Sequence, residues 1–213
     1  MKIVKERKKL ILIISGITLL VVLLLSLYFL LFRKGKKEEL FDPDSIITES
    51  VDTPSEEKPA PYSVPADLPK RIIIPKIGVK GYIQLVSIDQ YDRIAVPNNI
   101  YLVGWYINSV RPGEKGLSIV SGHKDGRTKP GIFMKLEKLK KGDKITVEYG
   151  DDSKREFVVY KTQQVSIEEA DTLMYERLKD VEKQLNLITC GGKYSKQIGT
   201  YEDRIIVFAG REE

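Results

Sequence analysis

Three side chains in this sequence could together carry out acyl transfer: Cys190, His123 and Arg204. A thiolate can attack a carbonyl carbon, and an imidazole can protonate the leaving amine and later deprotonate the incoming one. A guanidinium can hydrogen-bond the oxyanion, and its charge favours the thiolate. The chain of 213 residues has no other cysteine and no other histidine. This chemistry therefore depends on whether these three side chains meet in space.

Each of the three residues also has a non-catalytic interpretation. A free cysteine is often a small buried hydrophobe, an imidazole in a glycine-rich loop can simply be exposed, and an arginine at a strand edge can discourage edge pairing. Cysteine and histidine act through space, so their spacing along the chain is weak evidence. The enzymatic hypothesis therefore needs structural support.

The neighbouring residues indicate which elements position the three side chains. His123 lies between glycines directly after the apolar run 117–121, which predicts a loop at a strand end. Cys190 follows the run 185–189 and precedes two glycines, so we expect the strand to end there. Arg204 is expected to open the strand over 205–209.

Residues 70–213 have the pattern of a mainly β domain. A hairpin turn is expected over 150–153, and Ser166 and Glu169 have the capping-box spacing of a helix over 166–174. Many short strands with few helices predict a closed β-barrel with one or two short helices, and we expect the three reactive side chains at one mouth of it. The expected strands cover 72–74, 79–86, 103–106, 117–121, 144–149, 157–160, 185–189 and 205–209.

The stretch 10–32 contains no charged side chain and is long enough to cross a bilayer as a tilted helix. A cleavable signal peptide is the alternative, but its apolar region is shorter than this one. We predict an uncleaved transmembrane anchor over 10–32 after a cytoplasmic tail over 1–9. Basic residues flank both sides, so charge gives only a slight preference for a cytoplasmic N-terminus.

Residues 33–69 contain many prolines and acidic residues and no apolar periodicity. This composition predicts a disordered linker that holds the domain away from the lipid. The segment 41–47 has some apolar character and leaves open the alternative that part of the linker folds back on the domain.

Composition excludes several other functions. The 35 basic and 30 acidic residues give a formal charge of +5 with no basic stripe interleaved with aromatics, so we expect no nucleic-acid partner. One cysteine cannot form an internal disulfide, and one cysteine with one histidine cannot fill a structural zinc site. We expect no metal and no cofactor.

Four segments resemble the sortases, which are cysteine transpeptidases of Gram-positive bacteria. Residues 72–79 are similar to the family's opening strand, 122–123 to its catalytic-histidine loop, 187–190 to the motif around its nucleophile, and 201–207 to the strand that carries its arginine. The resemblance covers most of the chain from Arg71 onward. An anchor followed by a linker also matches the family's layout, which implies an extracellular catalytic domain over 70–213.

The resemblance implies cleavage of a sorting signal similar to Leu-Pro-x-Thr-Gly between Thr and Gly. The clients would be surface proteins that carry this signal. Cys190 would hold the acyl group as a thioester, an amine on a cell-wall precursor would resolve it, and Thr189 would help to frame the substrate pocket. His123 and Arg204 would take the roles given above.

The subclass stays open. Sortases that polymerise pilins usually carry a second, C-terminal membrane helix, and the end of this sequence at 211–213 favours an anchoring enzyme instead. Some relatives bind calcium, but the stretch 108–116 offers only Glu114, so no such site is expected.

Two other functions stay open on the residues alone. One is a secreted cysteine peptidase that passes the acyl group to water; papain-like and amidase-type enzymes place Cys before His, whereas here His123 precedes Cys190. The other is a membrane-anchored binding module whose thiol is inert.

Overall fold

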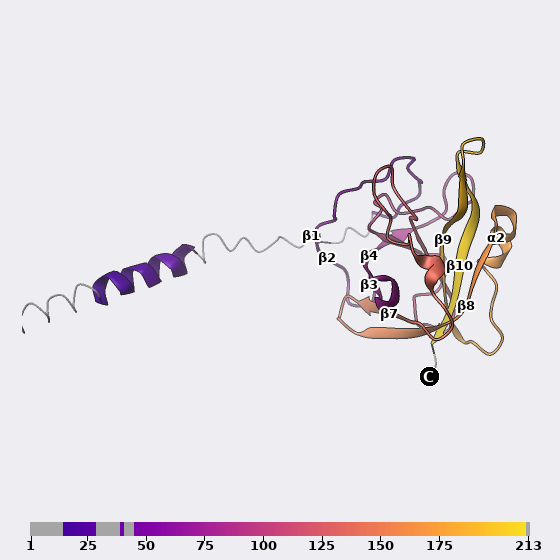
Figure 1. The fold of residues 1–213 in the computed structure, drawn as a ribbon. Coiled ribbons are helices and arrows are strands. Elements are labelled where there is room, and N and C mark those ends of the chain that lie inside the picture. The colour runs from indigo at the N-terminus through magenta and orange to yellow at the C-terminus, as the bar shows by residue number, and fades with distance from the viewer. Residues whose placement is uncertain (1–14, 29–38, 41–44, 212–213) are drawn as a thin grey trace, which may run out of the picture. The chain divides into compact units, whose positions relative to one another are not determined.

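The computed structural model describes residues 15–28, 39–40 and 45–211 (Figure 1). The chain divides into two compact units, Met1–Glu38 and Glu39–Glu213. In the first unit, residues 15–28 form an α-helix. Among the described residues, no helix has both the length and the apolar character that a membrane span requires. The predicted anchor over 10–32 extends at both ends into residues outside the described ones.

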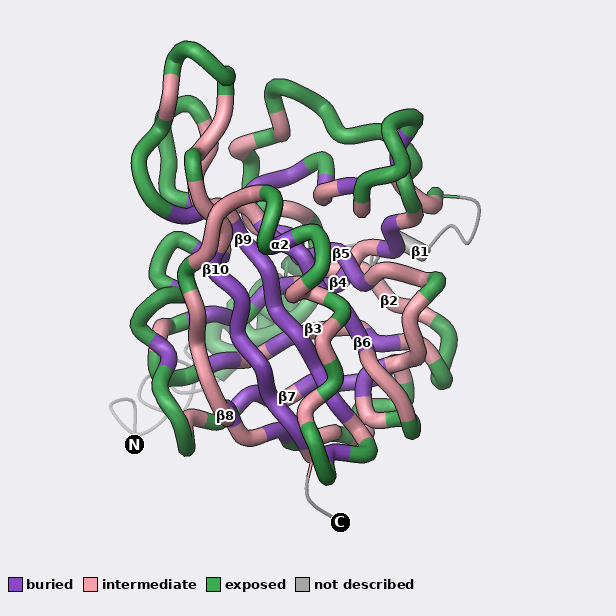
Figure 2. Tube along the Cα trace, turned by 90° about the vertical axis from the view of Figure 1, so that its right-hand side faces the viewer, coloured by how far each residue is buried: buried purple, intermediate pink, exposed green. Residues whose placement is uncertain are grey.

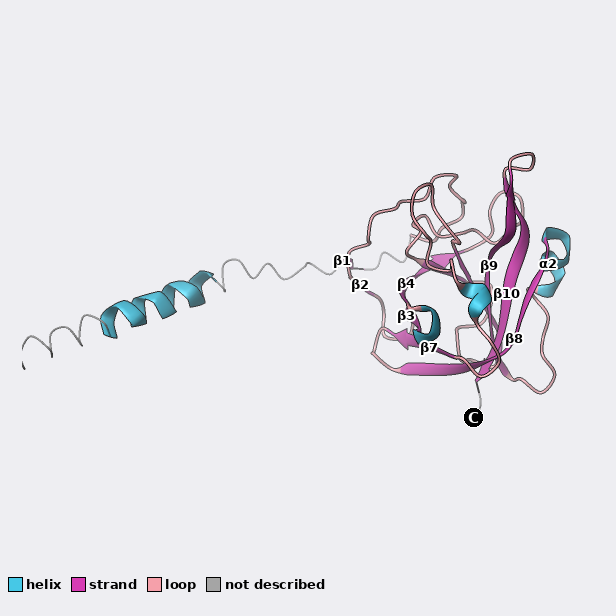
Figure 3. Cartoon of the chain, viewed as in Figure 1, coloured by secondary structure: helices cyan, strands magenta, loops and turns pink. Residues whose placement is uncertain are grey.

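Eight strands of the described second unit close into a barrel in the order β10-β8-β7-β3-β4-β5-β6-β9 (Figure 3). Neighbouring strands are antiparallel, except that β4 pairs with β5 and β6 pairs with β9 in parallel. Two short strands, β1 (Glu39–Leu40) and β2 (Tyr62–Ser63), form a separate parallel pair. The barrel strands are β3 (Pro69–Ile74), β4 (Val79–Val86), β5 (Val103–Tyr106), β6 (Gly116–Gly122), β7 (Lys144–Tyr149), β8 (Lys154–Ser166), β9 (Lys183–Ser195) and β10 (Thr200–Arg211).

Alternation of side chains along the strands builds two apolar clusters, one on each face of the sheet. Leu185 and Leu187 of β9 belong to the large cluster that fills the barrel. Ile188 of β9 and Phe208 of β10 belong to a smaller cluster on the outer face, together with Ala170 of the helix α2 (Ile167–Leu173). Figure 2 shows the buried stretches of β9 and β10 that lie beneath this helix. The outer face is therefore the one that α2 covers.

The helices are short. α2 begins at the predicted capping box, in which the Glu169 amide donates to Ser166 Oγ at 3.3 Å and the Ser166 amide donates to Glu169 Oε2 at 3.3 Å. Within residues 45–211, the other helical elements are two 3-10 turns, η1 (Pro75–Ile77) and η2 (Leu136–Lys138). The prediction of a mainly β, closed barrel with short helices is confirmed.

The prediction that β9 ends at Cys190 is wrong, because the strand continues to Ser195. Gly191 pairs with Asp203 and Tyr194 with Tyr201, so two residues of β9 face one of β10. This arrangement is a β-bulge, and Gly192 adopts a φ of +70° within it. The two glycines therefore kink the strand and do not end it. Likewise, Arg204 lies inside β10 and does not open it.

The prediction of a disordered linker over 33–69 is wrong for residues 45–69, which belong to the compact second unit. The Ile47 amide donates to Leu85 O at 2.9 Å, and Ile47 O accepts from the Ser87 amide at 2.8 Å. The Tyr62 hydroxyl also donates to the carbonyl of Ile83. Main-chain bonds of this kind order a segment whose side chains show no periodicity. Residues 33–38 and 41–44 lie outside the described ones.

Candidate active site

Cys190 lies on the outer face of the barrel. Successive residues of a strand point to opposite faces. Leu187 faces the barrel interior and Ile188 the outer cluster, so Thr189 takes the inner side and Cys190 the outer one. By the same alternation, Ile205 is internal and Arg204 external. The site is thus beside α2 on the outside of the sheet, and the prediction that it lies in a mouth of the barrel is wrong.

The strand register brings the three candidate residues into one row. Cys190 is directly opposite Arg204 in the antiparallel pair of β9 and β10. On the other side of β9, the parallel pairing with β6 ends at Ser121 opposite Ile188. His123 and Cys190 each come two residues after this last pair, so His123, just beyond the end of β6, lies level with Cys190. A cavity of about 600 Å³ is lined by all three residues and by Thr189.

His123 is held by hydrogen bonds at its main chain and at its ring. Its carbonyl accepts from the Phe133 amide at 2.9 Å, and the preceding carbonyl, of Gly122, accepts from Thr189 Oγ1 at 2.7 Å. Ring atom Nε2 lies 2.6 Å from Pro97 O. A carbonyl can only accept, so Nε2 carries the proton and donates. This leaves Nδ1 as the nitrogen available for proton exchange.

Arg204 is oriented by the bulge between β9 and β10. Its Nη1 donates to Tyr201 O at 3.0 Å and to Asp203 O at 2.9 Å. The bulge favours glycine at position 192, because its φ is +70° and a Cβ there would also lie 2.5 Å from Asp203 Oδ2. Among the residues that the structure describes, Arg204 makes no ion pair. Its remaining N–H groups are therefore free to bind a ligand oxygen.

Burial shifts the pKa values of Cys190 and His123 in opposite directions. Desolvation raises the pKa of the Cys190 thiol, and the positive charge of Arg204 only partly offsets this. Desolvation lowers the pKa of His123, while the hydrogen bond to Pro97 and the charge of Asp125 act in the opposite direction. The uncharged pair thus dominates near neutral pH, and the thiolate–imidazolium pair is the minor form.

Asp125 joins the histidine loop to β10, a contact that the sequence analysis did not foresee. Its carboxylate accepts a hydrogen bond from the Tyr201 hydroxyl. Desolvation, with the nearby Asp125, raises the pKa of Tyr201 to about 12. Lys124 Nζ lies 5.2 Å from the centre of the same ring. The negative charge of Asp125 raises the pKa of both Cys190 and His123, so this residue influences the protonation of both candidate groups.

The cavity is lined by both apolar and polar side chains. Asp89 shapes one side: its buried carboxylate accepts from the Tyr91 and Arg93 amides and forms an ion pair with Arg93 at 2.9 Å. The apolar lining residues are Ile94, Val96, Ile167, Ala170, Met174 and Ile188.

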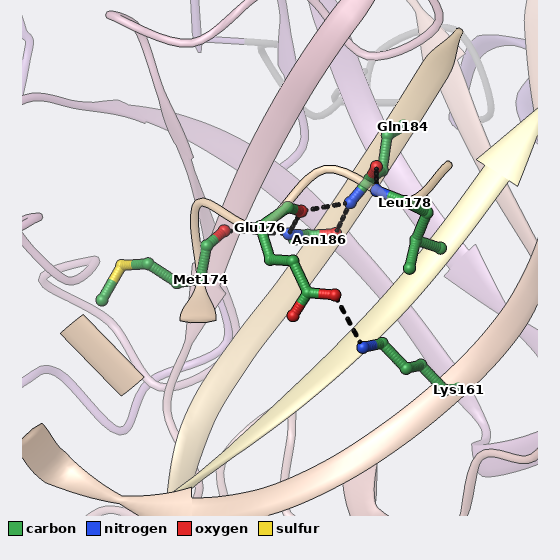
Figure 4. A network of polar contacts seen from close by, with 6 residues as sticks. All are labelled: Lys161, Met174, Glu176, Leu178, Gln184 and Asn186. Atoms are coloured by element: carbon green, nitrogen blue, oxygen red, sulfur yellow. Dashed lines mark hydrogen bonds and ion pairs between the residues drawn. The ribbon is translucent and has the colours of Figure 1, made fainter. Parts of the chain in front are cut away.

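The loop after α2, which contributes to the cavity lining, is held by two buried amides of β9 (Figure 4). Asn186 Nδ2 donates to Met174 O at 2.8 Å, and Gln184 Nε2 donates to Glu176 O at 2.8 Å. Gln184 Nε2 also donates to Asn186 Oδ1 at 2.9 Å, so the two amides support each other. Both side chains have no solvent exposure. They hold the loop after α2, whose Met174 lines the cavity.

Two further bonds complete this network. The Leu178 amide donates to Gln184 Oε1 at 2.7 Å, and Lys161 Nζ pairs with Glu176 Oε1 at 3.0 Å (Figure 4). The sequence does carry a signal for this network. Gln184 and Asn186 alternate with Leu185 and Leu187, and two amides on one face of an otherwise apolar strand indicate buried polar partners.

Comparison with protein families decides which group of enzymes this site belongs to. A model of the sortase domain matches residues 72–212. The chain belongs to the sortase family. It is accordingly a cysteine transpeptidase, and Cys190 is the single cysteine in its sequence.

Solved sortase structures share this fold. Sortase C-1 from Actinomyces oris is 25% identical, with a TM-score of 0.50 over 67% of this chain and 73% of that one. The sortase D5 transpeptidase from Clostridium perfringens is 26% identical, with a TM-score of 0.50 over 69% and 80%. A lid mutant of sortase A from Corynebacterium diphtheriae is 21% identical, with a TM-score of 0.52 over 68% and 70%, and supports the fold alone.

These sortases carry three different class letters, so the likeness does not select a subclass for this chain. A search of curated proteins gave no match.

Proposed function

We propose that this sortase cleaves a sorting signal similar to Leu-Pro-x-Thr-Gly between Thr and Gly and transfers the acyl group to an amine of a cell-wall precursor. Its clients would be surface proteins that carry this signal. The observation that carries the proposal is the row of His123, Cys190 and Arg204 along one cavity. The apolar walls of that cavity suit the Leu and Pro of such a signal.

The proposed reaction has two steps of acyl transfer. The Cys190 thiolate attacks the Thr carbonyl carbon, and Arg204 donates hydrogen bonds to the oxyanion that forms. The imidazolium of His123 gives a proton to the Gly amine as the C–N bond breaks, which leaves a thioester on Cys190. The incoming amine attacks this thioester, the neutral imidazole takes its proton, and the thiolate leaves. Both steps balance without a cofactor.

Thr189 is proposed to frame the pocket and not to bind the substrate with its hydroxyl. The hydroxyl already donates to Gly122 O at 2.7 Å, and the side chain is buried. Through this bond Thr189 ties the start of the histidine loop to the strand that carries Cys190.

The proposal also includes a membrane anchor over 10–32, with a cytoplasmic tail over 1–9 and the catalytic domain outside the cell. Its support is the uncharged sequence of 10–32 and the positive flank over 1–9.

A product assay tests the proposed transfer. The full chain in detergent is incubated with a sorting-signal peptide and a glycine amine, and the products are separated by mass. We expect the transfer product, an acyl-enzyme mass on the trapped protein, and neither of these for Cys190→Ala. A hydrolysed peptide alone at high amine concentration would instead indicate a peptidase.

The inert-thiol alternative has a separate test. Cys190 is half-buried in an open cavity, so a small alkylating agent should modify it in the native protein. Protection of the thiol until the protein is denatured would favour a non-catalytic binding module.

A further inference from the structure

A segment before the matched sortase domain reaches the candidate active site. The family model begins at residue 72, yet Ser50 lines the cavity beside His123. Ser50 Oγ accepts from the amide of Val96, another lining residue, at 3.3 Å. Residues after Ser50 in the same segment make further contacts. These contacts are with two parts of the chain that hold the His123 imidazole in place.

The first support is the main chain around Pro97, whose carbonyl accepts from His123 Nε2. Ser55 pairs with this stretch through both of its main-chain groups. Its amide donates to Asn98 O at 2.8 Å, and its carbonyl accepts from the Ile100 amide at 3.0 Å. Ser55 thus fixes the residues that follow Pro97, and with them the carbonyl that orients the ring.

The second support is the loop that begins at His123. The Glu56 carboxylate accepts from the Thr128 amide at 2.8 Å and also from the Thr128 hydroxyl. Lys129 Nζ donates to Glu56 O at 3.0 Å. The fit is close, since a Cβ on Gly126 would lie 2.4 Å from Glu56 Oε1. Glu56 therefore hydrogen-bonds Thr128 and Lys129 of this loop and packs closely against Gly126.

We propose that Ser55 and Glu56 form a clamp that positions the His123 imidazole for proton transfer, with Glu56 as its main side-chain contact. The clamp holds at once the carbonyl that binds Nε2 and the loop that carries the ring. Proton transfer needs the imidazole within hydrogen-bond reach of sulfur and amine, so small movements of the ring are costly. This inference rests on the proposed role of His123 as the acid and base of the reaction.

The sequence offers a matched control at the next residue. Glu57 has the same charge, and its carboxylate makes no hydrogen bond or ion pair within residues 45–211. Its carbonyl accepts from Asn99 Nδ2 at 2.8 Å, a bond that alanine retains. Glu56→Ala and Glu57→Ala therefore remove equal charge from adjacent positions, but only Glu56→Ala removes hydrogen bonds to the loop, those with Thr128.

The experiment compares these two variants of the full chain in detergent micelles. Histidine labelled with ¹³C gives one imidazole signal, because the chain has one histidine. We expect Glu56→Ala to lower kcat on the order of 10-fold with KM nearly unchanged, because the ring is misplaced. The imidazole should also titrate at higher pH, since a loosened ring is rehydrated and burial is what lowers its pKa. Glu57→Ala should match the wild type in both measurements.

Other charges around the ring stay constant in this comparison. Asp125 of the same loop acts on the imidazole, and Cys190 and Arg204 line the same cavity. Thr128→Val removes the hydroxyl from the other side of the same contact and should shift the titration in the same direction. It provides a second test if Glu56→Ala fails to fold.

A Glu56→Ala protein that folds, titrates at the wild-type pH and turns over like Glu57→Ala would overturn the clamp. Lower turnover with an unchanged imidazole titration would also overturn the clamp proposal, because Glu56 would then affect turnover without acting on His123. Absence of any acyl-enzyme in the wild type would refute the proposed function instead. The titration does not depend on turnover, so the two failures can be told apart.

Discussion

Cys190 and Arg204 are directly opposite each other on neighbouring antiparallel strands, and both lie on the outer face of the barrel. Side chains at opposite positions of such a pair are neighbours, with Cβ atoms about 4.5–5.5 Å apart. The charge of Arg204 lowers the pKa of the thiol, against the larger effect of burial. The carbonyls of Tyr201 and Asp203 hold the guanidinium in place.

Arg204→Lys keeps the charge but loses the planar fork. We expect kcat/KM to fall about 100-fold, as when one oxyanion donor is removed. The pH at which Cys190 becomes reactive should stay near the wild-type value in Arg204→Lys and rise in Arg204→Gln, since only the latter loses the positive charge. Steady-state rates and alkylation rates against pH measure both effects. Near-normal turnover of Arg204→Lys would remove Arg204 from the mechanism.

Asp125→Asn should move the whole pH–rate profile to lower pH. The negative charge of Asp125 raises the pKa of both His123 and Cys190, so its removal lowers both. The acid limb and the alkaline limb should shift together, and the limbs report the coupled pair. Asp151→Asn, in the exposed hairpin turn, should leave the profile unchanged. A shift of one limb only would contradict the expectation.

Asn186→Ala should weaken substrate binding through the wall of the cavity (Figure 4). The change leaves Met174 O without its buried donor and removes one of the two acceptors of Gln184 Nε2, which keeps Glu176 O, at a cost of about 1–3 kcal/mol in the free energy of unfolding. KM for the peptide should rise, while alkylation of Cys190 should proceed at the wild-type rate.

Thr162→Val is the control for this variant, because Thr162 Oγ1 donates to Leu139 O at 2.8 Å and neither residue lines the cavity. It should cost stability without raising KM. Equal KM values for the two variants, at similar stability in urea, would show that the network has no part in binding.

Gly192→Ala should reduce activity by disturbing the bulge that orients Arg204. Gly192 has a φ of +70°, and its new Cβ would meet Asp203 Oδ2 at 2.5 Å. Gly199→Ala isolates the backbone effect, since Gly199 has a φ of +71° and open space around its Cβ position. Each should lose about 1 kcal/mol of stability from the left-handed backbone, but only Gly192→Ala should lower kcat/KM. If Gly192→Ala and Gly199→Ala had equal kcat/KM values, the bulge would have no role in catalysis.

Local patterns predicted the parts of the fold that local residues determine. β4, β5 and β7 begin and end where apolar alternation and turn residues placed them. The capping-box spacing of Ser166 and Glu169 located α2. Rare residue types singled out Cys190 and His123. These signals all come from near neighbours in the chain.

The parts that were missed depend on partners far along the chain. Gly191 and Gly192 permit either a turn or a bulge, and the pairing of β9 with β10 selects the bulge. The face on which Cys190 lies follows from packing against α2, which its own flanking residues do not reveal. The contacts of Ser55 and Glu56 use main-chain groups and one exposed carboxylate, so they leave no apolar pattern to recognise.

The ordered segment 45–69 decides where a working fragment of this enzyme should be cut. A fragment that starts at Lys70 would keep all residues that match the family model, 72–212, yet it would remove hydrogen-bond partners of Leu85, Ile83 and Asn98. Truncated preparations would then understate the turnover of the intact protein, and residue 45 is the better first position for crystallisation and inhibitor screening.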